Sequence, residues 1–383
     1  MCGVLGHRRR CVSLVVGCLL VLAGCAQPAV APTAPSPELP ELTTREPLPN
    51  WTPAKPATFT LVASGDVLIH PALTEQAVAD GNGRRDYRPI LAGVKSVVQG
   101  ADLAICHLET PLGDAAGPFA GYPAFNAPPE IATALADTGY DLCSTASNHT
   151  LDRGPAGVDS TLDALDAAGI RHTGSARSAE DASTPTIVDL NGVRVGHVSF
   201  TFALNGGTSV AGTPWLVNLL SVDGVLQAAR AAKAAGADVV VVSLHWGVEY
   251  QSQPSAAQQA IARQLLADPA VDLIIGHHAH VVQPFEQIAG KWVAYGLGNH
   301  LARHSEPRGT TEEGVIARFR FGKNQAGQWV VDRADYVPTL VDLGPPIRLL
   351  DVTSLPDGAR KEAVERRVGE IIRSRGAVLV PPG

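Results

Sequence analysis

Apolar runs with strand character alternate along the chain with segments whose apolar residues have helical spacing. The predicted strands are 58–63, 101–106, 141–145, 238–244, 271–275 and 291–297, and the predicted helices are 130–139, 156–168, 220–235 and 256–266. Most of these strands are apolar at nearly every position, which is typical of strands that are buried on both faces beneath helices. The pattern therefore predicts an α/β protein with one main core.

Further strands and a last helix complete the predicted elements. The dipeptide Asn191-Gly192 separates two β-rich runs, 187–190 and 193–202, and favours a tight hairpin turn between them. Two more strands are expected within 315–338, around Gly327. One helix is expected near the end of the chain, at 360–373.

The first residues have the composition of an export signal. Three arginines, 8–10, precede an apolar run over 12–22, which is shorter than the roughly 20 residues that a membrane-spanning helix needs. The run ends in Leu22-Ala23-Gly24-Cys25, which resembles the lipobox whose cysteine is acylated in bacterial lipoproteins. An ordinary signal peptide with an incidental Cys25 is the alternative. We expect an exported bacterial lipoprotein, held by a lipid anchor at Cys25 on the outer face of the cell membrane.

The patterns divide the chain into four regions. The segment after Cys25 is rich in Pro, Ala, Thr and Glu and lacks apolar periodicity, which is typical of an extended tether. The expected regions are a lipoprotein signal peptide at 1–24, a Pro-rich tether at 25–57, a main domain at 58–345 and a C-terminal extension, forming one helix, at 346–383.

Composition and charge narrow the function classes. Hydrophobic residues make up 45% of the 383 residues and charged residues 17%, which suits a folded domain with a large core. The chain has 30 basic and 37 acidic residues, for a formal net charge of −7, and no basic stripe. We therefore expect no nucleic-acid partner.

Two cysteines, Cys106 and Cys143, lie in predicted strands of the main domain. An exported protein could join them in a disulfide. Both lie in apolar segments of buried strands, so two free buried thiols are at least as good an interpretation. The spacing between Cys106 and Cys143 does not suit a cysteine zinc site.

Polar side chains gather where the predicted strands end. The carboxyl ends of strands in open α/β sheets meet at one edge, where sites assemble. Imidazole, carboxylate and amide groups together suit zinc, iron or manganese rather than metals that prefer thiolates. Eight such side chains lie within a few residues of a strand end: Asp66, Glu109, Asn148, His149, His245, His277, His278 and His280.

Each motif also has a simpler interpretation. Asp66 fits a capped turn, Glu109 a solvated carboxylate, and Asn148 the start of a helix. The run 276–280 is the strongest single signal, because three histidines in four residues cost solubility and packing unless they coordinate something. His245, at the end of an apolar strand, is the next strongest. Three further histidines beside these motifs could support the ligands or touch a substrate: His70, His107 and His300. Three others are expected to be structural or exposed: His172, His197 and His304.

The joint order of the motifs is more specific than any one of them. The series is Gly65-Asp66, Leu108-Glu109, Asn148-His149 with Asp152 and Gly154, His245-Trp246-Gly247 with Glu249-Tyr250, Gly276-His277-His278-Ala279-His280-Val281 with Gln283, and Tyr295-Gly296-Leu297-Gly298-Asn299. Over about residues 58–305 it resembles the CapA-type poly-γ-glutamate capsule biosynthesis family, which is related to calcineurin-like metallophosphoesterases. The resemblance implies a four-layer αββα sandwich of the metallophosphoesterase type, with a two-metal site at one edge.

The resemblance also implies roles for individual residues. His149 would be the catalytic acid or the stabiliser of the transition state, and His277 could replace His278 as a ligand. The implied ligands of two divalent metal ions (Mn, Fe or Zn) are Asp66, Glu109, Asn148, His245, His278 and His280.

The chain departs from the family's motifs at several positions. Leu68 stands two residues after Asp66, where metallophosphoesterases carry a histidine ligand, and His70 is the replacement that the sequence offers. Glu109 stands where the superfamily more often has a bridging aspartate. Two histidines, His107 in place of a usual Asn and His300 in place of a usual Phe after Asn299, are candidate local specialisations.

Three functions fit the resemblance. The first is a metal-dependent phosphoesterase-type hydrolase that uses a water molecule activated by two metal ions on a phosphoester. The second is a non-catalytic factor that binds an anionic polymer or assists a polymer synthase or export machinery. The third is hydrolysis of an amide or ester in a wall polymer by the same water. We favour the first for the chemistry, within capsule, poly-γ-glutamate or other cell-envelope polymer metabolism.

Overall fold

The computed structural model describes residues 57–207, 210–304 and 309–379. The expected signal peptide, Cys25 and all but the last residue of the expected tether lie outside the described residues. Among the helices of the described ranges, none combines the length and the apolar character needed to cross a membrane.

The first sheet has eight strands, and most of it follows the order β14-β13-β12-β1-β2-β3-β4, with β11 paired to β1. The strands β1 to β4 are parallel, whereas β12, β13 and β14 pair antiparallel. The bounds are β1 Thr58–Val67, β2 Leu103–Leu108, β3 Leu142–Ser144, β4 Arg171–Thr173, β11 Asn299–Leu301, β12 Glu313–Lys323, β13 Trp329–Asp342 and β14 Arg348–Asp351.

The second sheet has six strands in the order β5-β6-β7-β8-β10-β9. Its centre, β6, β7, β8 and β10, is parallel, and the edge pairs are antiparallel. The predicted hairpin is confirmed: Asn191 and Gly192 both have positive φ angles, which suit a tight hairpin turn between β5 and β6. The bounds are β5 Thr186–Leu190, β6 Val193–Thr201, β7 Val239–His245, β8 Leu273–His277, β9 Phe285–Ile288 and β10 Lys291–Ala294.

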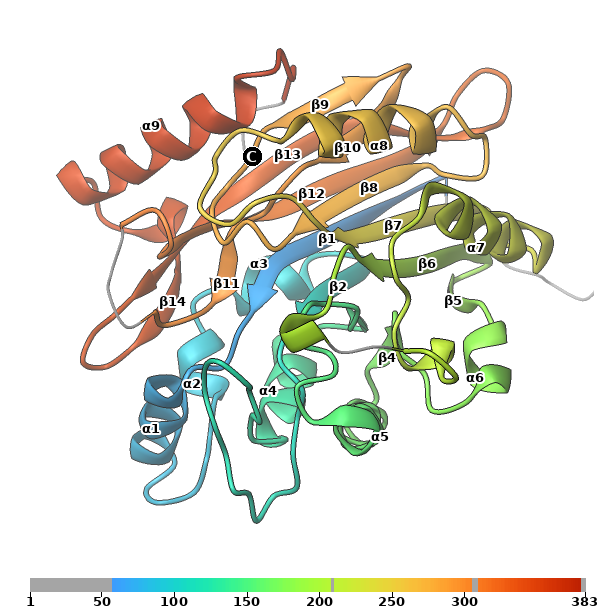
Figure 1. Ribbon diagram of the computed structural model, residues 1–383. Helices are drawn as coiled ribbons and strands as arrows, with labels where there is room; N and C mark the ends of the chain where they lie inside the picture. Colours follow the sequence, from blue (N-terminus) through green and yellow to red (C-terminus); the bar gives the residue numbers. More distant parts are fainter. Residues whose placement is uncertain (1–56, 208–209, 305–308, 380–383) are drawn as a thin grey trace, which may run out of the picture. The chain divides into compact units, whose positions relative to one another are not determined.

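Helices cover the outer face of each sheet, except that the last helix packs against the core between the sheets (Figure 1). Their bounds are α1 Pro71–Asp80, α2 Arg88–Leu91, α3 Lys95–Gln99, α4 Glu130–Thr138, α5 Gly154–Ala167, α6 Ala179–Ser183, α7 Val222–Ala234, α8 Ala256–Leu266 and α9 Ala359–Arg373. Short 3₁₀ turns lie at Asn205–Gly207, Pro214–Leu216 and Val352–Ser354.

Three apolar cores hold these layers together. One core lies between the two sheets and includes β1, β2, β7, β8 and β12 side chains. The second lies between the outer face of the first sheet and α1 to α4, and the third between the outer face of the second sheet and α7 and α8. The order helix, sheet, sheet, helix confirms the predicted four-layer αββα class.

The alternating side chains of β1 show how the sequence builds two of these cores. Leu61 points into the core between the sheets, and its neighbour Val62 points into the helix-covered core. Both side chains are almost wholly buried. A strand that is apolar on both faces can therefore bury both faces only in the middle of such a layered protein.

The fold differs from the predicted pattern at the end of β1 and at the chain's C-terminal part. β1 runs on to Val67, because Asp66 still pairs with His107 of β2 and Asn299 of β11. After residue 345, β14 pairs with β13, and α9 places Val368 and Ile372 in the core between the sheets. The last described residues are thus part of the main fold.

Cys106 and Cys143 are disulfide-bonded in the structure. They are direct partners in the parallel register of β2 and β3, with their Cα atoms 4.5 Å apart. Both are fully buried, as predicted, but the interpretation as free thiols does not hold. The sequence could not predict this disulfide, because the two cysteines are 37 positions apart and only the register of β2 and β3 brings them together.

Candidate metal centre

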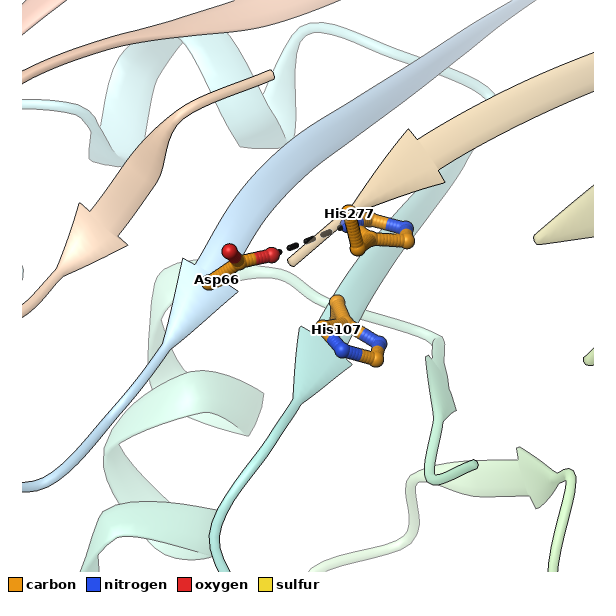
Figure 2. A group of neighbouring side chains, drawn as sticks. All are labelled: Asp66, His107 and His277. Atoms are coloured by element: carbon orange, nitrogen blue, oxygen red, sulfur yellow. Dashed lines mark ion pairs between the residues drawn. The ribbon is translucent and has the colours of Figure 1, made fainter. Parts of the chain in front are cut away.

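The carboxyl ends of four parallel strands bring the candidate ligands together. Asp66 lies near the end of β1 and pairs with His107 of β2, while His245 ends β7 and pairs with His277, which ends β8. Figure 2 shows Asp66, His107 and His277 converging from three strands that belong to two different sheets. The edge that the sequence predicted as the site therefore lies where the two sheets meet.

Asp66 is surrounded by the histidines of the 276–280 run. Its Oδ1 lies 3.3 Å from Nδ1 of His277, and its Oδ2 lies 3.2 Å from Nδ1 of His280. The backbone N–H of His278 also donates to Oδ2, at 3.1 Å. His278 and His280 both have positive φ angles, so the chain winds tightly around this carboxylate.

Glu109 lies between two imidazoles. Its Oε1 is 3.9 Å from Nε2 of His245 and 3.7 Å from Nε2 of His280. His245 Nε2 also lies 2.7 Å from Oδ1 of Asn148, whose amide nitrogen donates to Oδ1 of Asn205. The ring of His278 lies 4.6 Å from that of His245. The carboxylate of Glu109 therefore lies between His280, which neighbours Asp66, and His245, which neighbours Asn148.

The donor atoms of this cluster fit divalent cations. Several buried ones have no hydrogen-bond partner among the described residues: Asp66 Oδ1, both Glu109 carboxylate oxygens, both His277 ring nitrogens and His278 Nδ1. Buried polar atoms are normally paired. A group of this many unpaired ligand atoms therefore marks a position where a bound cation would complete the bonding. Four overlapping sets each bring their ligand atoms within 4.8 Å: Asp66, His107 and His277; His107, Glu109 and His245; Glu249, His278 and His280; and Asp66, Glu109 and His280.

The electrostatics of the cluster favour added positive charge. Burial raises the pKa of Glu109 to about 7. Burial alone would lower the pKa of His280, but the carboxylates of Glu109 and Asp66 outweigh it and raise that pKa to about 10. Burial also disfavours the charged form of Asp66, yet the nearby imidazoles of His277 and His280, with Nδ1 atoms 3.3 and 3.2 Å from its oxygens, hold its pKa well below the usual range. Two buried carboxylates therefore draw a positive charge, either a proton or a metal ion, to this position.

His149 lies beside the cluster and is oriented by an acid. Its Nδ1 lies 2.6 Å from Oδ2 of Asp152, and both side chains are buried. The ring makes an edge-to-face contact with Phe125, with centroids 4.8 Å apart. The hydrogen bond to Asp152 occupies Nδ1, while Nε2 lies 3.4 Å from the amide nitrogen of Asn205, another residue that lines the cleft described below.

A wide cleft of about 1310 Å³ opens beside the cluster. Asn148, His149 and His280 are among the residues that line it. Its other polar lining includes Asp152, Asn205, Glu249, Tyr250, Arg303 and His304. The motif series contained Asp152, Glu249 and Tyr250, but sequence analysis missed Asn205 and Arg303 and placed His304 among the structural residues. Asn205 and Arg303 lie in connections with no motif or periodicity to reveal them.

The other candidates divide into supporting and separate residues. Asn299 accepts a hydrogen bond from Nδ1 of His280 at 2.9 Å, so it orients that ring. His70 lines the cleft, with Nδ1 3.0 Å from the carbonyl of Leu68, and His300 Nε2 lies 2.8 Å from the hydroxyl of Tyr140. Neither His70 nor His300 belongs to any of the metal-capable sets found among the described residues.

The fold and the site define a class: a four-layer αββα protein with histidines, carboxylates and an amide gathered at one strand-end edge. The profile described as "Bacterial capsule synthesis protein PGA_cap" matches residues 60–304. The chain therefore belongs to this capsule synthesis protein family.

Two curated relatives agree with the family. The chain is 30% identical over 221 residues to "Capsule biosynthesis protein CapA" of Bacillus anthracis, covering 57% of this chain and 52% of that protein. It is 30% identical over 208 residues to "PGA biosynthesis protein CapA" of Bacillus subtilis (strain 168), covering 54% and 53%. The matches span about half the length of these relatives.

A solved structure, "calcineurin-like phosphoesterase YfkN from Bacillus subtilis", covers 82% of this chain and 97% of its own chain. The sequence identity is 15% and the TM-score is 0.44, a likeness too weak to support an argument about function.

Proposed function

We propose that this protein is a metal-dependent hydrolase of the phosphoesterase type that acts in capsule or cell-envelope polymer metabolism. The observation that carries the proposal is the convergence of Asp66, Glu109 and His245 from separate strands on one buried cluster with unpartnered donor atoms. Structural ion pairs satisfy their own donors, whereas this cluster retains free ligand atoms beside an open cleft.

Two sets of residues would hold the ions, with Glu109 shared between them. Asp66 and His280 are the ligands on one side, and three side chains form the other: Asn148, His245 and His278. Two divalent ions held there would lower the pKa of a bound water molecule and offset the charge of a phosphoryl group.

His149 is the proposed proton donor to the leaving oxygen. In the protonated imidazole both ring nitrogens donate, and Nδ1 already has its acceptor in Asp152. The remaining N–H at Nε2 is then available for a leaving group in the cleft. Asp152 holds the ring in place through its hydrogen bond to Nδ1, while Phe125 packs on the ring from one side.

The cleft supports a substrate larger than a single phosphate group. Its volume of about 1310 Å³ exceeds the roughly 300–1,000 Å³ of ordinary small-molecule pockets. An anionic chain lying along it would meet Arg303 and the proposed ions, so a phosphoester within a polymer or a polymer precursor fits the site. Such a substrate would agree with the lipid anchor proposed at Cys25, which would hold the protein on the outer face of the membrane.

A non-catalytic role is the second candidate. One relative, 28% identical over 216 residues, is a "Probable polyglutamine synthesis accessory protein" of Mycobacterium tuberculosis. In such a role the metal-bearing cleft would hold a polycarboxylate or assist a synthase or exporter without cleaving anything. Hydrolysis of an amide or ester in a wall polymer remains a variant of the first candidate, with the same residues.

Turnover measurements separate these candidates. The purified protein is freed of metal and reloaded with manganese or zinc. It is then tested on phosphoesters and on polymer fragments, beside His149→Gln and the control His300→Gln, whose histidine lies outside the cluster. We expect metal-stimulated phosphoester cleavage that falls at least about 100-fold in His149→Gln and persists in the control. Metal-dependent polymer binding without any turnover would favour the accessory role instead.

The anchor has its own test. Replacing Cys25 with serine removes the proposed acylation site, so we expect the protein to move from the membrane fraction to the soluble extracytoplasmic fraction. A Cys25→Ser protein that stays with the membrane would contradict the proposed lipid attachment.

A further inference from the structure

His107 is a fully buried histidine that touches the cluster without a free ligand atom. Its Nδ1 lies 2.8 Å from Oγ of Ser144, its direct neighbour in the register of β2 and β3. Its Nε2 lies 3.0 Å from Nδ1 of His245, the histidine at the end of β7. Both ring nitrogens are therefore engaged in hydrogen bonds, one of them to the proposed ligand His245, although two of the metal-capable sets include His107.

The position of one proton decides whether His245 can bind a cation. Its Nε2 lies 2.7 Å from Oδ1 of Asn148 and faces Glu109, and it can coordinate a cation there only if it carries a lone pair while the proton sits on Nδ1. Nδ1–H then donates to Nε2 of His107. His107 in turn carries its proton on Nδ1 and donates to Ser144, whose hydroxyl can donate to the carbonyl oxygen of Cys106 at 3.3 Å.

If the same hydrogen bonds run in the reverse direction, Nε2 of His245 carries a proton and cannot bind a cation. If the hydroxyl of Ser144 donates to His107, then His107 donates from Nε2 to Nδ1 of His245. The proton of His245 is thereby placed on Nε2, between the ring and Oδ1 of Asn148. Ser144 has one proton, and its donation to the carbonyl of Cys106 leaves its oxygen to accept from Nδ1–H of His107, which favours the first order. The contact of His245 Nε2 with Oδ1 of Asn148 favours the reverse order, and a cation held by these two side chains would replace that contact.

We propose that His107 and Ser144 form a positioning pair that keeps the proton of His245 on Nδ1 and so presents Nε2 to a divalent cation. The inference rests on the proposed metal binding and adds Ser144, which lies outside every motif, to the functional residues. Partners of this kind fix the tautomer and the ring orientation of a metal-binding histidine, and their loss typically lowers metal affinity about 10- to 100-fold.

Paired substitutions test the hydrogen bond rather than the packing. The amide of a glutamine at 107 reaches the place of the histidine Nε2, whereas that of an asparagine reaches only the place of Nδ1. His107→Gln therefore retains an acceptor for His245, and His107→Asn loses it. The matched control for Ser144→Ala is Ser243→Ala, because Ser243 bonds the buried His197 at 2.8 Å in the same way but has no contact with His245 among the described hydrogen bonds.

The readout is zinc affinity of the full-length metal-free protein, measured by competition with a chromophoric chelator. We expect one of the bound zinc ions to be weakened about 10- to 100-fold in His107→Asn and in Ser144→Ala. His107→Gln should stay within a few-fold of the unsubstituted protein, and so should Ser243→Ala. Nitrogen-15 spectra of the histidine-labelled, zinc-loaded protein should show the proton of His245 on Nδ1.

The contrary outcomes are distinct. Equal loss in His107→Asn and His107→Gln, or equal affinities of Ser144→Ala and Ser243→Ala, would overturn the positioning role while leaving the proposed function intact. An unsubstituted protein that binds no zinc would overturn both. If the variants do not fold, the nitrogen-15 spectra of the unsubstituted protein decide, and a proton on Nε2 of His245 would refute the pair.

Discussion

At the scale of single residues, the imidazole beside Asp66 belongs to His277 rather than to His70. The histidine expected two residues after Asp66 is absent, since Leu68 stands there, and His70 was the nearest imidazole along the chain. His70 instead precedes α1 and lies at the cleft, while Nδ1 of His277 lies 3.3 Å from Asp66. Proximity in sequence could not identify this neighbour, because it comes from the other sheet.

We therefore predict that His277, and not His70, contributes to metal binding. His277→Phe should lower zinc affinity by about 10-fold or more, since it removes the imidazole whose Nδ1 lies 3.3 Å from the buried carboxylate of Asp66. His70→Phe, at the cleft, is the matched control and should leave zinc affinity within a few-fold. Zinc content after dialysis and chelator competition measure both, and a larger loss in His70→Phe would reverse the assignment.

His300 shows how a buried histidine outside the cluster links stability to pH. Burial lowers its pKa to about 3 from 6.5, so between these values the unfolded chain binds more protons than the folded one. Lowering the pH through this window therefore favours unfolding, and at pH 5 the contribution is about 2 kcal/mol relative to pH 7.

The prediction compares the pH dependence of the free energy of unfolding of His300→Gln with that of the unsubstituted protein. His300→Gln keeps a polar group near the hydroxyl of Tyr140 but cannot be protonated. Between pH 7 and pH 5, its free energy of unfolding should fall by about 2 kcal/mol less than that of the unsubstituted protein. Urea unfolding at both pH values measures this, and equal losses in the two proteins would show that His300 is not neutral when folded.

At the scale of elements, periodicity predicted the long helices and the central strands, and it missed the short ones. The predicted 256–266 helix is α8 itself, with a capping box from Ser255 and Gln258. In contrast, α2 and α3 have four and five residues, too few to display a period. Three-residue strands such as β4 and β11 were missed for the same reason, since their positions depend on neighbours far away in sequence.

The disulfide between β2 and β3 should add stability to the folded protein. It closes a loop between residues that are 37 positions apart, directly before His107 and Ser144. Replacing both Cys106 and Cys143 by alanine should lower the free energy of unfolding by about 2–4 kcal/mol. Denaturant unfolding without reductant measures the change, and the unsubstituted protein should approach the variant when a reductant is added. No difference between them would mean that the disulfide does not form.

The last helix should behave as part of the core rather than as an appendage. Ile372 of α9 is fully buried in the core between the sheets, whereas Glu370 on the same helix is exposed. Ile372→Ala should cost about 2–5 kcal/mol of unfolding free energy, and Glu370→Ala should stay within about 0.5 kcal/mol. Similar small effects in both variants would show that α9 does not pack as described.

At the scale of the whole molecule, the pattern predicted buried strands beneath helices and a site at their carboxyl ends, and the family resemblance implied the four layers, but neither predicted the cleft. Buried strands demand helices on both sides, and parallel strands bring their carboxyl ends to one edge. These two rules suffice to gather Asp66 and Glu109, whereas His245 ends a strand of the other sheet and meets them only because the two sheets pack together. The cleft is built from connecting segments around Tyr122, Asn205 and Arg303, whose paths no local pattern determines.

Crystals of the manganese-loaded protein, measured at the manganese absorption edge, give the most direct test of the central claim. We predict two anomalous peaks that share Glu109, one near Asp66 and His280 and the other near Asn148, His245 and His278. The proposal is contradicted if the map shows no peak in this cluster, or if manganese lies only at surface carboxylates elsewhere.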